Sequence, residues 1–180
     1  MLTIKIDEHV SLRLIDLKDA ERIFELIDQS RDYLRKWLPW VDGTATAEDT
    51  KSFIKLSLRN HANGRGMDFV ILLDGLIVGI AGINLINWTN KTAEIGYWLG
   101  EHYQGRGIMT KTASALTDYA FKQIMLNKVE IRAAAQNQKS RSIPERLGFK
   151  MEGCIRQAEW MYDHYVDHCI FGMLAAEWSF

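Results

Sequence analysis

The stretch Gln104-Gly-Arg-Gly-Ile-Met-Thr110 has the composition of a loop that binds an anion. It follows a strand-like run, Thr92-Ala-Glu-Ile-Gly-Tyr-Trp-Leu99, and precedes an amphipathic run that predicts a helix over about residues 108–125. Glycines let the loop backbone turn sharply and approach a ligand closely. The first N–H groups of a helix have no partner within the helix, and the helix dipole favours negative charge there. The stretch therefore predicts a binding site for phosphate or pyrophosphate.

Two common phosphate-binding fingerprints do not fit this loop. The dinucleotide pattern G-x-G-x-x-G fails because the residue three after Gly107 is Thr110, and the chain has no Gly-Lys-Ser/Thr. What remains, Gln-x-x-Gly after an aromatic strand, resembles the acetyl-CoA loop (Gln/Arg-x-x-Gly-x-Gly/Ala) of the GNAT N-acetyltransferase superfamily. Gln104 and Gly107 match this loop, whereas Met109 stands where the family usually has Gly or Ala. For the loop alone, an ordinary strand-to-helix turn is the other interpretation.

A second segment extends the resemblance. Asn137-x-x-Ser140, which runs on to Gly-Phe149, is similar to the family's Asn-x-x-Ser/Ala…Gly-Phe segment and lies one helix and one strand after the loop. Gln157-Ala-Glu159 and the N-terminal Tyr-Leu-Arg-Lys-Trp-Leu-Pro-Trp40 are similar to the RimJ/RimL ribosomal-protein-serine acetyltransferases. The resemblance therefore covers nearly the whole chain.

The resemblance implies acetyl-CoA as the cofactor and assigns roles residue by residue. Asn137 is expected to contact the pantetheine arm, Ser140 to protonate the departing thiolate, and Glu159 to act as the general base. The strand ending at Trp98-Leu99 is expected to splay from the strand at about 128–135 and to offer backbone groups to pantetheine and to the developing oxyanion. The implied cofactor-binding residues are Trp98, Leu99, Gln104, Gly105, Arg106, Gly107, Ile108, Met109, Thr110 and Asn137.

One position departs from the family. Many members have a tyrosine general acid four residues before the Gly of Gly-Phe, and here that residue is Pro144. Because proline cannot donate a proton, Ser140 becomes the candidate acid. We expect Pro144 to lie in the first turn of its helix, where a missing N–H costs little. The departure also leaves open a non-catalytic acyl-CoA-binding module.

Several candidate site residues have a second, structural interpretation. Ser140 could only cap a helix, and Glu159 could be a solvated strand residue. Glu94 is a rival base at the acceptor side, or the partner in a cross-strand pair. Trp37 and Trp40 could line a groove for the acceptor or pack in the core.

The implied reaction is acetyl transfer from a thioester to an amine, which must be neutral to attack. An α-amine with a pKa of about 7.8 is roughly one-seventh neutral at pH 7, whereas a lysine is neutral only about once in 2,500. A carboxylate such as Glu159 could therefore suffice for an α-amine. The N-terminus of a protein such as a ribosomal protein is the expected acceptor, and a small amine (a polyamine or an antibiotic) is the alternative. The aromatic and basic region from Tyr33 to Trp40 favours a peptide over a polyamine.

Composition sets the remaining limits. The 180 residues carry a formal net charge of −1, with 47% hydrophobic and 25% charged residues, which suits one domain over residues 1–180 and provides no basic field for nucleic acid. No run of about 18 apolar residues and no signal peptide is visible, and Cys154 and Cys169 lack C-x-x-C spacing, so we expect a cytoplasmic protein with reduced thiols. His164 and His168 fall in a strand-like run, too far apart for one metal ion, and no metal is expected. A homodimer or a higher homo-oligomer is expected by analogy.

The order of predicted elements indicates a mixed α/β domain, with a mostly antiparallel sheet and helices on both faces, as in the acetyltransferase fold. Asp16 and Thr46 are predicted to start helices, Asp74-Gly75 to form a hairpin turn, and Asn127 to end the long helix as a left-handed residue. The predicted strands lie at about 10–15, 67–73, 76–86, 92–99, 128–135, 150–160 and 165–174.

Overall fold

The computed structural model describes residues 1–179, so Phe180, the last residue of the predicted domain, lies outside it. Within this range the strands form an eight-stranded sheet in the order β1-β2-β3-β4-β5-β6-β8-β7. Neighbouring strands are antiparallel except β5 and β6, which are parallel. The strands are β1 (Thr3–Lys5), β2 (Val10–Leu14), β3 (Met67–Leu73), β4 (Leu76–Asn87), β5 (Thr92–Leu99), β6 (Lys128–Ala134), β7 (Lys150–Met161) and β8 (His164–Leu174).

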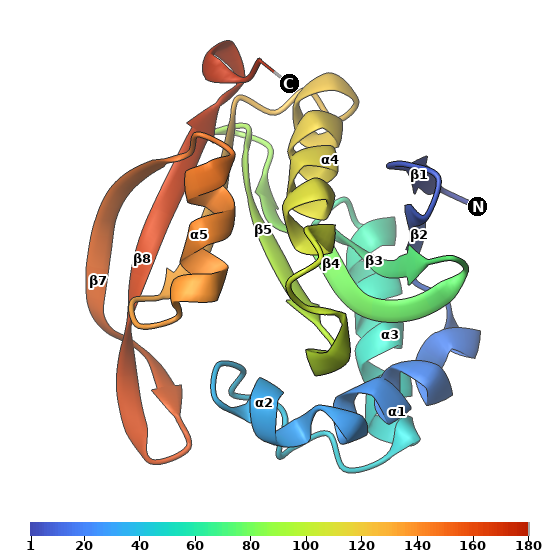
Figure 1. Cartoon of the computed structure of the whole chain (residues 1–180). Coiled ribbons are helices and arrows are strands. Elements are labelled where there is room, and N and C mark those ends of the chain that lie inside the picture. Colours follow the sequence, from blue (N-terminus) through green and yellow to red (C-terminus); the bar gives the residue numbers. More distant parts are fainter. Residues whose placement is uncertain (180) are drawn as a thin grey trace.

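Helices cover both faces of the sheet, as predicted (Figure 1). One apolar cluster joins α4 and α5 to the sheet and contains Leu116, Ile143 and Ile95. The other joins α1 and α3 to the opposite face and contains Ile23 and Ile80. The helices are α1 (Ala20–Gln29), α2 (Arg31–Arg35), α3 (Ala47–Ala62), α4 (Ile108–Lys122) and α5 (Gln138–Arg146), with single 3-10 turns η1 (Leu17–Asp19), η2 (Glu101–Tyr103) and η3 (Ala175–Glu177).

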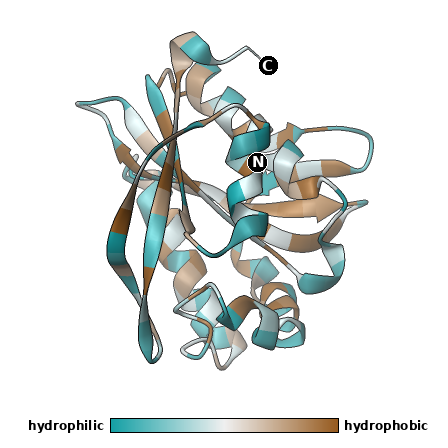
Figure 2. Cartoon of the chain, turned by 60° about the vertical axis from the view of Figure 1, so that its left-hand side comes forward, coloured by the Kyte–Doolittle hydropathy of each residue, from teal (hydrophilic) through white to brown (hydrophobic). Residues whose placement is uncertain are grey.

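Local sequence signals account for several boundaries. Asp16 and Thr46 each form a capping box with the acidic residue three positions later, which satisfies N–H groups that the helix leaves without partners. Hydrophobic residues fall on the sheet-facing sides of the helices and polar residues on their outer sides, a pattern visible in the hydropathy colouring of Figure 2. Gly148, at φ +80°, follows α5 in the left-handed conformation with which glycine commonly ends a helix.

The pairing between β5 and β6 is short, and this positions the site. In the described residues it consists of Thr92↔Lys128, Ala93↔Val129 and Glu94↔Glu130, although both strands continue beyond these pairs. The predicted splay of β5 from β6 is thus present. On its other side β5 stays paired with β4 as far as Leu99.

Two local expectations were wrong, and one strand was not predicted. The helix α4 ends at Lys122, and Met125, not Asn127, takes the left-handed conformation, at φ +61°. Pro144 lies inside α5 and not in its first turn. The short strand β1 was not predicted, because three residues paired only with the edge strand β2 carry little periodic signal.

Candidate active site

The loop before α4 has the geometry of an anion site. Gly105 and Gly107 have φ of +74° and +72°, and a Cβ placed on either would meet nothing within 4 Å, so open space lies beside the backbone. Gly107 is the N-cap of α4, whose first N–H groups point out of the helix without intrahelical partners. The Ile108 and Met109 side chains are buried in the core, so their backbones alone can contact a ligand. Met109 therefore departs from the family pattern without filling the loop.

Polar side chains from other elements surround this loop. Gln104 accepts a hydrogen bond from the Tyr33 hydroxyl of α2 at 2.6 Å, which ties the loop to the opposite side of the sheet. Arg146, at the end of α5, donates to the Thr110 hydroxyl at 3.3 Å. Arg106 is exposed and donates to the carbonyl of His102 at 3.2 Å. Arg106 and Arg146 thus bring positive charge to the N-terminus of α4. Arg146 was not predicted from the sequence, because its position depends on how α5 packs against α4.

The free edge of β5 offers backbone groups beyond Glu94. The Gly100 N–H donates to the carbonyl of Val78 at 2.9 Å, so even-numbered residues of β5 pair with β4 by the alternation of an antiparallel ladder. The N–H and C=O groups of Tyr97 and Leu99 consequently point to the side where β6 has separated. Leu99 was predicted to contact the cofactor and has this orientation. The backbone of Trp98 faces β4, and its ring lies on the α1–α3 face of the sheet.

Asn137 and Ser140 lie at the start of α5, across from this edge. The Asn137 side chain is the N-cap of α5 and accepts from the Ser140 N–H at 3.2 Å. The Ser140 carbonyl would normally accept from residue 144, but Pro144 has no N–H. The Tyr97 hydroxyl of β5 donates to it instead, at 3.1 Å. Burial raises the pKa of this phenol well above its usual range, which keeps it protonated as a donor.

Glu159 follows a bulge in β7. The register between β7 and β8 shifts between Ile155 and Glu159, and Gln157 within this shift has φ +48°. The Asp167 carboxylate accepts from the Gln157 N–H at 2.7 Å and so holds the bulge. The partly buried Glu159 carboxylate lies 3.1 Å from Nε2 of His168 on β8. Glu159 is thus oriented by His168 and is not simply a solvated strand residue.

Glu94 lies where β5 and β6 part. Its carboxylate is 3.0 Å from Nε of Arg132 on β6. This is the cross-strand pair that the sequence offered as the alternative to a catalytic role for Glu94. Burial raises the pKa of Glu94, while Arg132 acts in the opposite direction. A base that is already paired with a guanidinium is less available for a substrate proton.

A cavity of about 460 Å³ lies on the α1–α3 face of the sheet. Trp40 and Trp98 line it with their ring centroids 6.0 Å apart, whereas Trp37 is partly buried and is not among the lining residues. Asp68 and Asn84 provide polar groups in its wall. Of the two tryptophans proposed for the acceptor, the structure therefore places Trp40 at a cavity.

The tip of the β7–β8 hairpin lies near α2 and the segment after it (Figure 1). At its tip the Tyr162 hydroxyl donates to the carbonyl of Leu38 at 2.6 Å and accepts from the Val41 N–H at 3.2 Å. The Arg35 guanidinium lies 3.8 Å from the centre of the Tyr162 ring. These contacts join the segment after α2 to the hairpin that carries Glu159.

The histidines of β8 have separate carboxylate partners. His164 pairs with Asp163 at 2.6 Å and His168 with Glu159. Among residues 1–179, no group of three or more His, Cys, Asp or Glu side chains is arranged to hold a metal ion. The same residues include no helix that is both long and apolar enough to cross a membrane.

Comparison with known proteins identifies a family that agrees with the geometry of this site. Residues 9–150 match the family model described as "Acetyltransferase (GNAT) domain". The YdaF protein of Bacillus subtilis (strain 168) is 37% identical over 180 residues, which covers 99% of this chain and 98% of YdaF. A ribosomal-protein-serine acetyltransferase of Escherichia coli (strain K12) is 32% identical over 165 residues, 92% of each chain.

A solved structure agrees with the sequence matches. RimL, a ribosomal alpha-N-protein acetyltransferase in complex with coenzyme A, superposes with a TM-score of 0.93 at 26% identity, covering 96% of this chain and 98% of RimL. The chain therefore belongs to the GNAT acetyltransferase family. It is an N-acetyltransferase, with the fold and subgroup that its sequence motifs predict.

Proposed function

We propose that the chain transfers acetyl from acetyl-CoA to the N-terminal α-amine of a protein, with a ribosomal protein as the physiological acceptor. The observation that carries this proposal is the free edge of β5, which leads from the N-terminus of α4 to an aromatic cavity on the other face of the sheet. Cofactor and acceptor can thus approach the same strand from opposite sides. The relatives named for ribosomal-protein acetylation support the choice of acceptor.

The residues at the loop and the strand edge fit coenzyme A. The open space beside Gly105 and Gly107 and the free N–H groups of α4 suit a pyrophosphate, and Arg106 and Arg146 add positive charge. The outward backbone groups of Tyr97 and Leu99 suit the amides of pantetheine, and Asn137 lies at the start of α5 across from them. When bound, acetyl-CoA supplies an activated acyl group as a thioester.

Two side chains are proposed for proton transfer. Glu159, held by His168, takes the proton of the acceptor amine directly or through a water. Ser140, whose main chain is held by Asn137 and Tyr97, gives a proton to the departing thiolate. The helix-capping role at the start of α5 is played by Asn137, so the Ser140 hydroxyl is not needed as a cap.

We further propose that the chain works as one catalytic domain and that two copies pair through β7. This edge strand is largely exposed and presents Met151, Ile155 and Trp160, beside Tyr165 of β8. A ribosomal-protein acceptor would place the enzyme in the cytoplasm. Light scattering after size-exclusion chromatography tests the pairing, and a monomer mass for the native protein would contradict it.

The activity is tested by acetyl-CoA turnover, followed as thiol release, with one panel of peptides bearing free N-termini and one of small amines. Ser140→Ala and Glu159→Gln are compared with Ser142→Ala and Glu145→Gln, which alter a partly buried and an exposed position of α5. We expect turnover on peptides that falls at least about 100-fold in the two site variants and changes little in the controls, with coenzyme A affinity retained in all four. Turnover on small amines alone, or tight coenzyme A binding without any turnover, would replace this proposal with the corresponding alternative.

A further inference from the structure

Asp68 of β3 is a carboxylate in the cavity wall that none of the roles above uses. Oδ2 of Asp68 accepts a hydrogen bond from the Ser57 hydroxyl of α3 at 2.6 Å. Oδ1 has no hydrogen-bond or ion-pair partner in residues 1–179, and it is not sealed from the cavity. Burial raises the pKa of Asp68, against the opposing effect of the Ser57 hydrogen bond. An ionised carboxylate is costly in this position unless a cation accompanies it.

Two glycines allow this carboxylate to reach toward β5. Asp68 pairs with Gly82 of β4, and Gly82 pairs with Gly96 of β5, so the three residues lie in one row across the sheet. A Cβ at Gly82 would lie 2.3 Å from Oδ1 of Asp68, which means that the carboxylate occupies the space a side chain would fill. Oδ1 therefore lies over β4, about one strand spacing (roughly 4.8 Å) from β5.

The cavity extends from Asp68 to the free edge of β5. Its lining includes three consecutive residues of β5: Gly96, Tyr97 and Trp98. Because the side chains of consecutive strand residues point to opposite faces, the cavity reaches residues of both faces of β5. The amide of Asn84 lies over Gly96, with Nδ2 3.4 Å from a Cβ placed there. Among the carboxylates considered for the site, Asp68 lines the cavity and Glu94 and Glu159 do not.

We propose that Asp68 binds the acceptor as its ammonium ion and so delivers the N-terminal nitrogen of the acceptor to the edge of β5. This inference rests on the proposed N-acetyltransferase function and names the anchoring residue for its acceptor. A cavity with a single carboxylate, lined also by Trp40 and Trp98, suits a substrate with one ammonium group on a small or apolar body, because the rings can add cation–π and apolar contact. A polyamine would bring further cations for which the cavity lining offers no second carboxylate.

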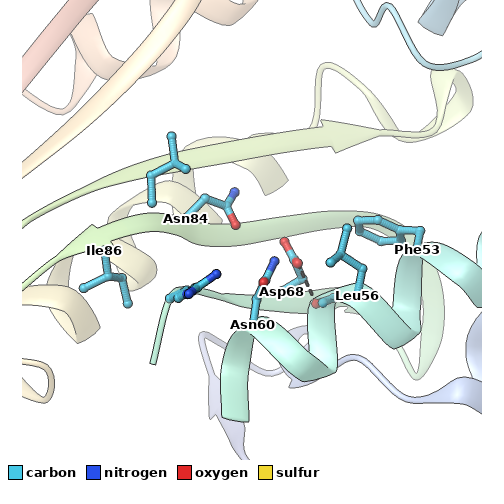
Figure 3. Close-up of a pocket in the computed structure, with 10 residues that line it drawn as sticks. Phe53, Leu56, Asn60, Asp68, Asn84 and Ile86 are labelled. Carbon is cyan, nitrogen blue, oxygen red and sulfur yellow. Dashed lines mark hydrogen bonds between the residues drawn. The ribbon is translucent and has the colours of Figure 1, made fainter. Parts of the chain in front are cut away.

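An adjoining groove gives a peptide acceptor room to continue. A second cavity, of about 740 Å³, shares Phe53, Asp68 and Asn84 with the first and lies between α3 and the bulge of β4 (Figure 3). The side chains of Asn60, Asp68 and Asn84 line it, together with the half-exposed Leu56. An acceptor anchored at Asp68 can therefore place its first residue in one cavity and its following residues in the other.

The anchor is tested without turnover, by calorimetric titration of a peptide into enzyme saturated with coenzyme A. The probe is the amide of Ser-Ala-Ala-Ala, and its N-acetylated twin has the same side chains without the cation. We expect the free-amine peptide to bind wild-type enzyme and the twin to bind far more weakly. Asp68→Asn should weaken the free-amine peptide about 30-fold or more, as expected for removing one partner of a buried charge pair. Asp74→Asn, in the exposed β3–β4 turn, should leave it unchanged.

Thermal unfolding separates this role from a structural one. If Asp68 binds the acceptor and does not stabilise the fold, Asp68→Asn should lose peptide affinity. The same variant should keep or raise the Tm, because it removes a buried charge. Asp68→Ser removes the same carboxylate and replaces Asp68→Asn in the titration if Asp68→Asn does not fold. Equal affinity of Asp68→Asn and wild type, equal binding of the acetylated twin, or no binding of the free-amine peptide would overturn the proposal. An enzyme that binds the peptide through Asp68 but acetylates no peptide would refute the proposed function alone.

The groove is tested by peptide length in the same titration. Leu56→Gln should weaken Ser-Ala-Ala-Ala amide several-fold and leave Ser-Ala amide unchanged, since only the longer peptide reaches α3. Lys55→Gln changes the neighbouring exposed position, which does not line the groove, and should alter neither. Equal loss for both peptides in Leu56→Gln, or no loss for either, would contradict the assignment of the groove.

Discussion

Replacing Gly107 by alanine separates backbone strain from cofactor binding. Gly107 has φ +72° and a Cβ there would meet nothing within 4 Å, so the substitution introduces no clash with the protein. The left-handed conformation costs a non-glycine residue about 1–2 kcal/mol. The more restricted unfolded chain returns roughly 0.4–1 kcal/mol of this. We therefore expect a net loss of about 1 kcal/mol in the free energy of unfolding, or about 2–4 °C in Tm for a chain of this size.

Gly75→Ala provides the matched control. Gly75 has φ +83°, a Cβ there would likewise meet nothing within 4 Å, and the residue lies in the turn between β3 and β4, away from the loop. Both variants should lose similar stability. Only Gly107→Ala should also lose coenzyme A affinity, by about tenfold or more, because the methyl group stands where a phosphate would approach the N–H groups of α4.

The assay is a titration of coenzyme A by calorimetry beside a thermal melt of each unliganded variant. The reasoning is refuted if Gly107→Ala binds coenzyme A as tightly as Gly75→Ala does. In that case the open space beside Gly107 is not part of the phosphate site.

Three further predictions follow from single contacts. Tyr97→Phe removes the hydroxyl that donates to the Ser140 carbonyl and should cost about 1–2 kcal/mol of unfolding free energy, measured by urea titration. In a Pro144→Ala background the helix regains an N–H for this carbonyl, so the same change should cost less. An equal loss in both backgrounds would show that the Tyr97 hydroxyl does not replace the missing N–H. Asn137→Ala should cost about 1 kcal/mol as a lost N-cap and also weaken coenzyme A binding, and unchanged affinity would remove Asn137 from the cofactor site. The pKa of Asp68 is raised above its ordinary 3.8, so the native state binds more protons than the unfolded chain. Wild-type stability should therefore fall as pH rises from about 4 through the native pKa, and the stability advantage of Asp68→Asn over wild type should grow over the same pH window. An advantage independent of pH would contradict a buried charge at Asp68.

Much of the fold could be predicted because its signals are local. Thr46 with Asp49 marks a helix start, Asp74-Gly75 a hairpin, and Gly148 a helix end, and each depends on a few neighbouring residues. The cofactor loop is also one continuous segment. These features do not require knowledge of which strands are neighbours.

The parts that could not be predicted depend on register between distant segments. Asp68 is one polar residue in an apolar strand until Gly82 and Gly96 are known to lie beside it in the sheet. In the same way, Pro144 shows that the Ser140 carbonyl lacks its helical donor, but the sequence does not show that the Tyr97 hydroxyl replaces it. Pairing that crosses the sheet is set by the whole fold and leaves no local pattern.

The most direct test of the central claim is the position of the transferred acetyl group. A peptide with a free N-terminal serine and one internal lysine is incubated with acetyl-CoA and enzyme, and tandem mass spectrometry locates the modification. Acetyl on the α-nitrogen, lost in Glu159→Gln, is the result we predict. Acetyl on the lysine side chain, or an unmodified peptide beside an acetylated small amine, would contradict the proposal.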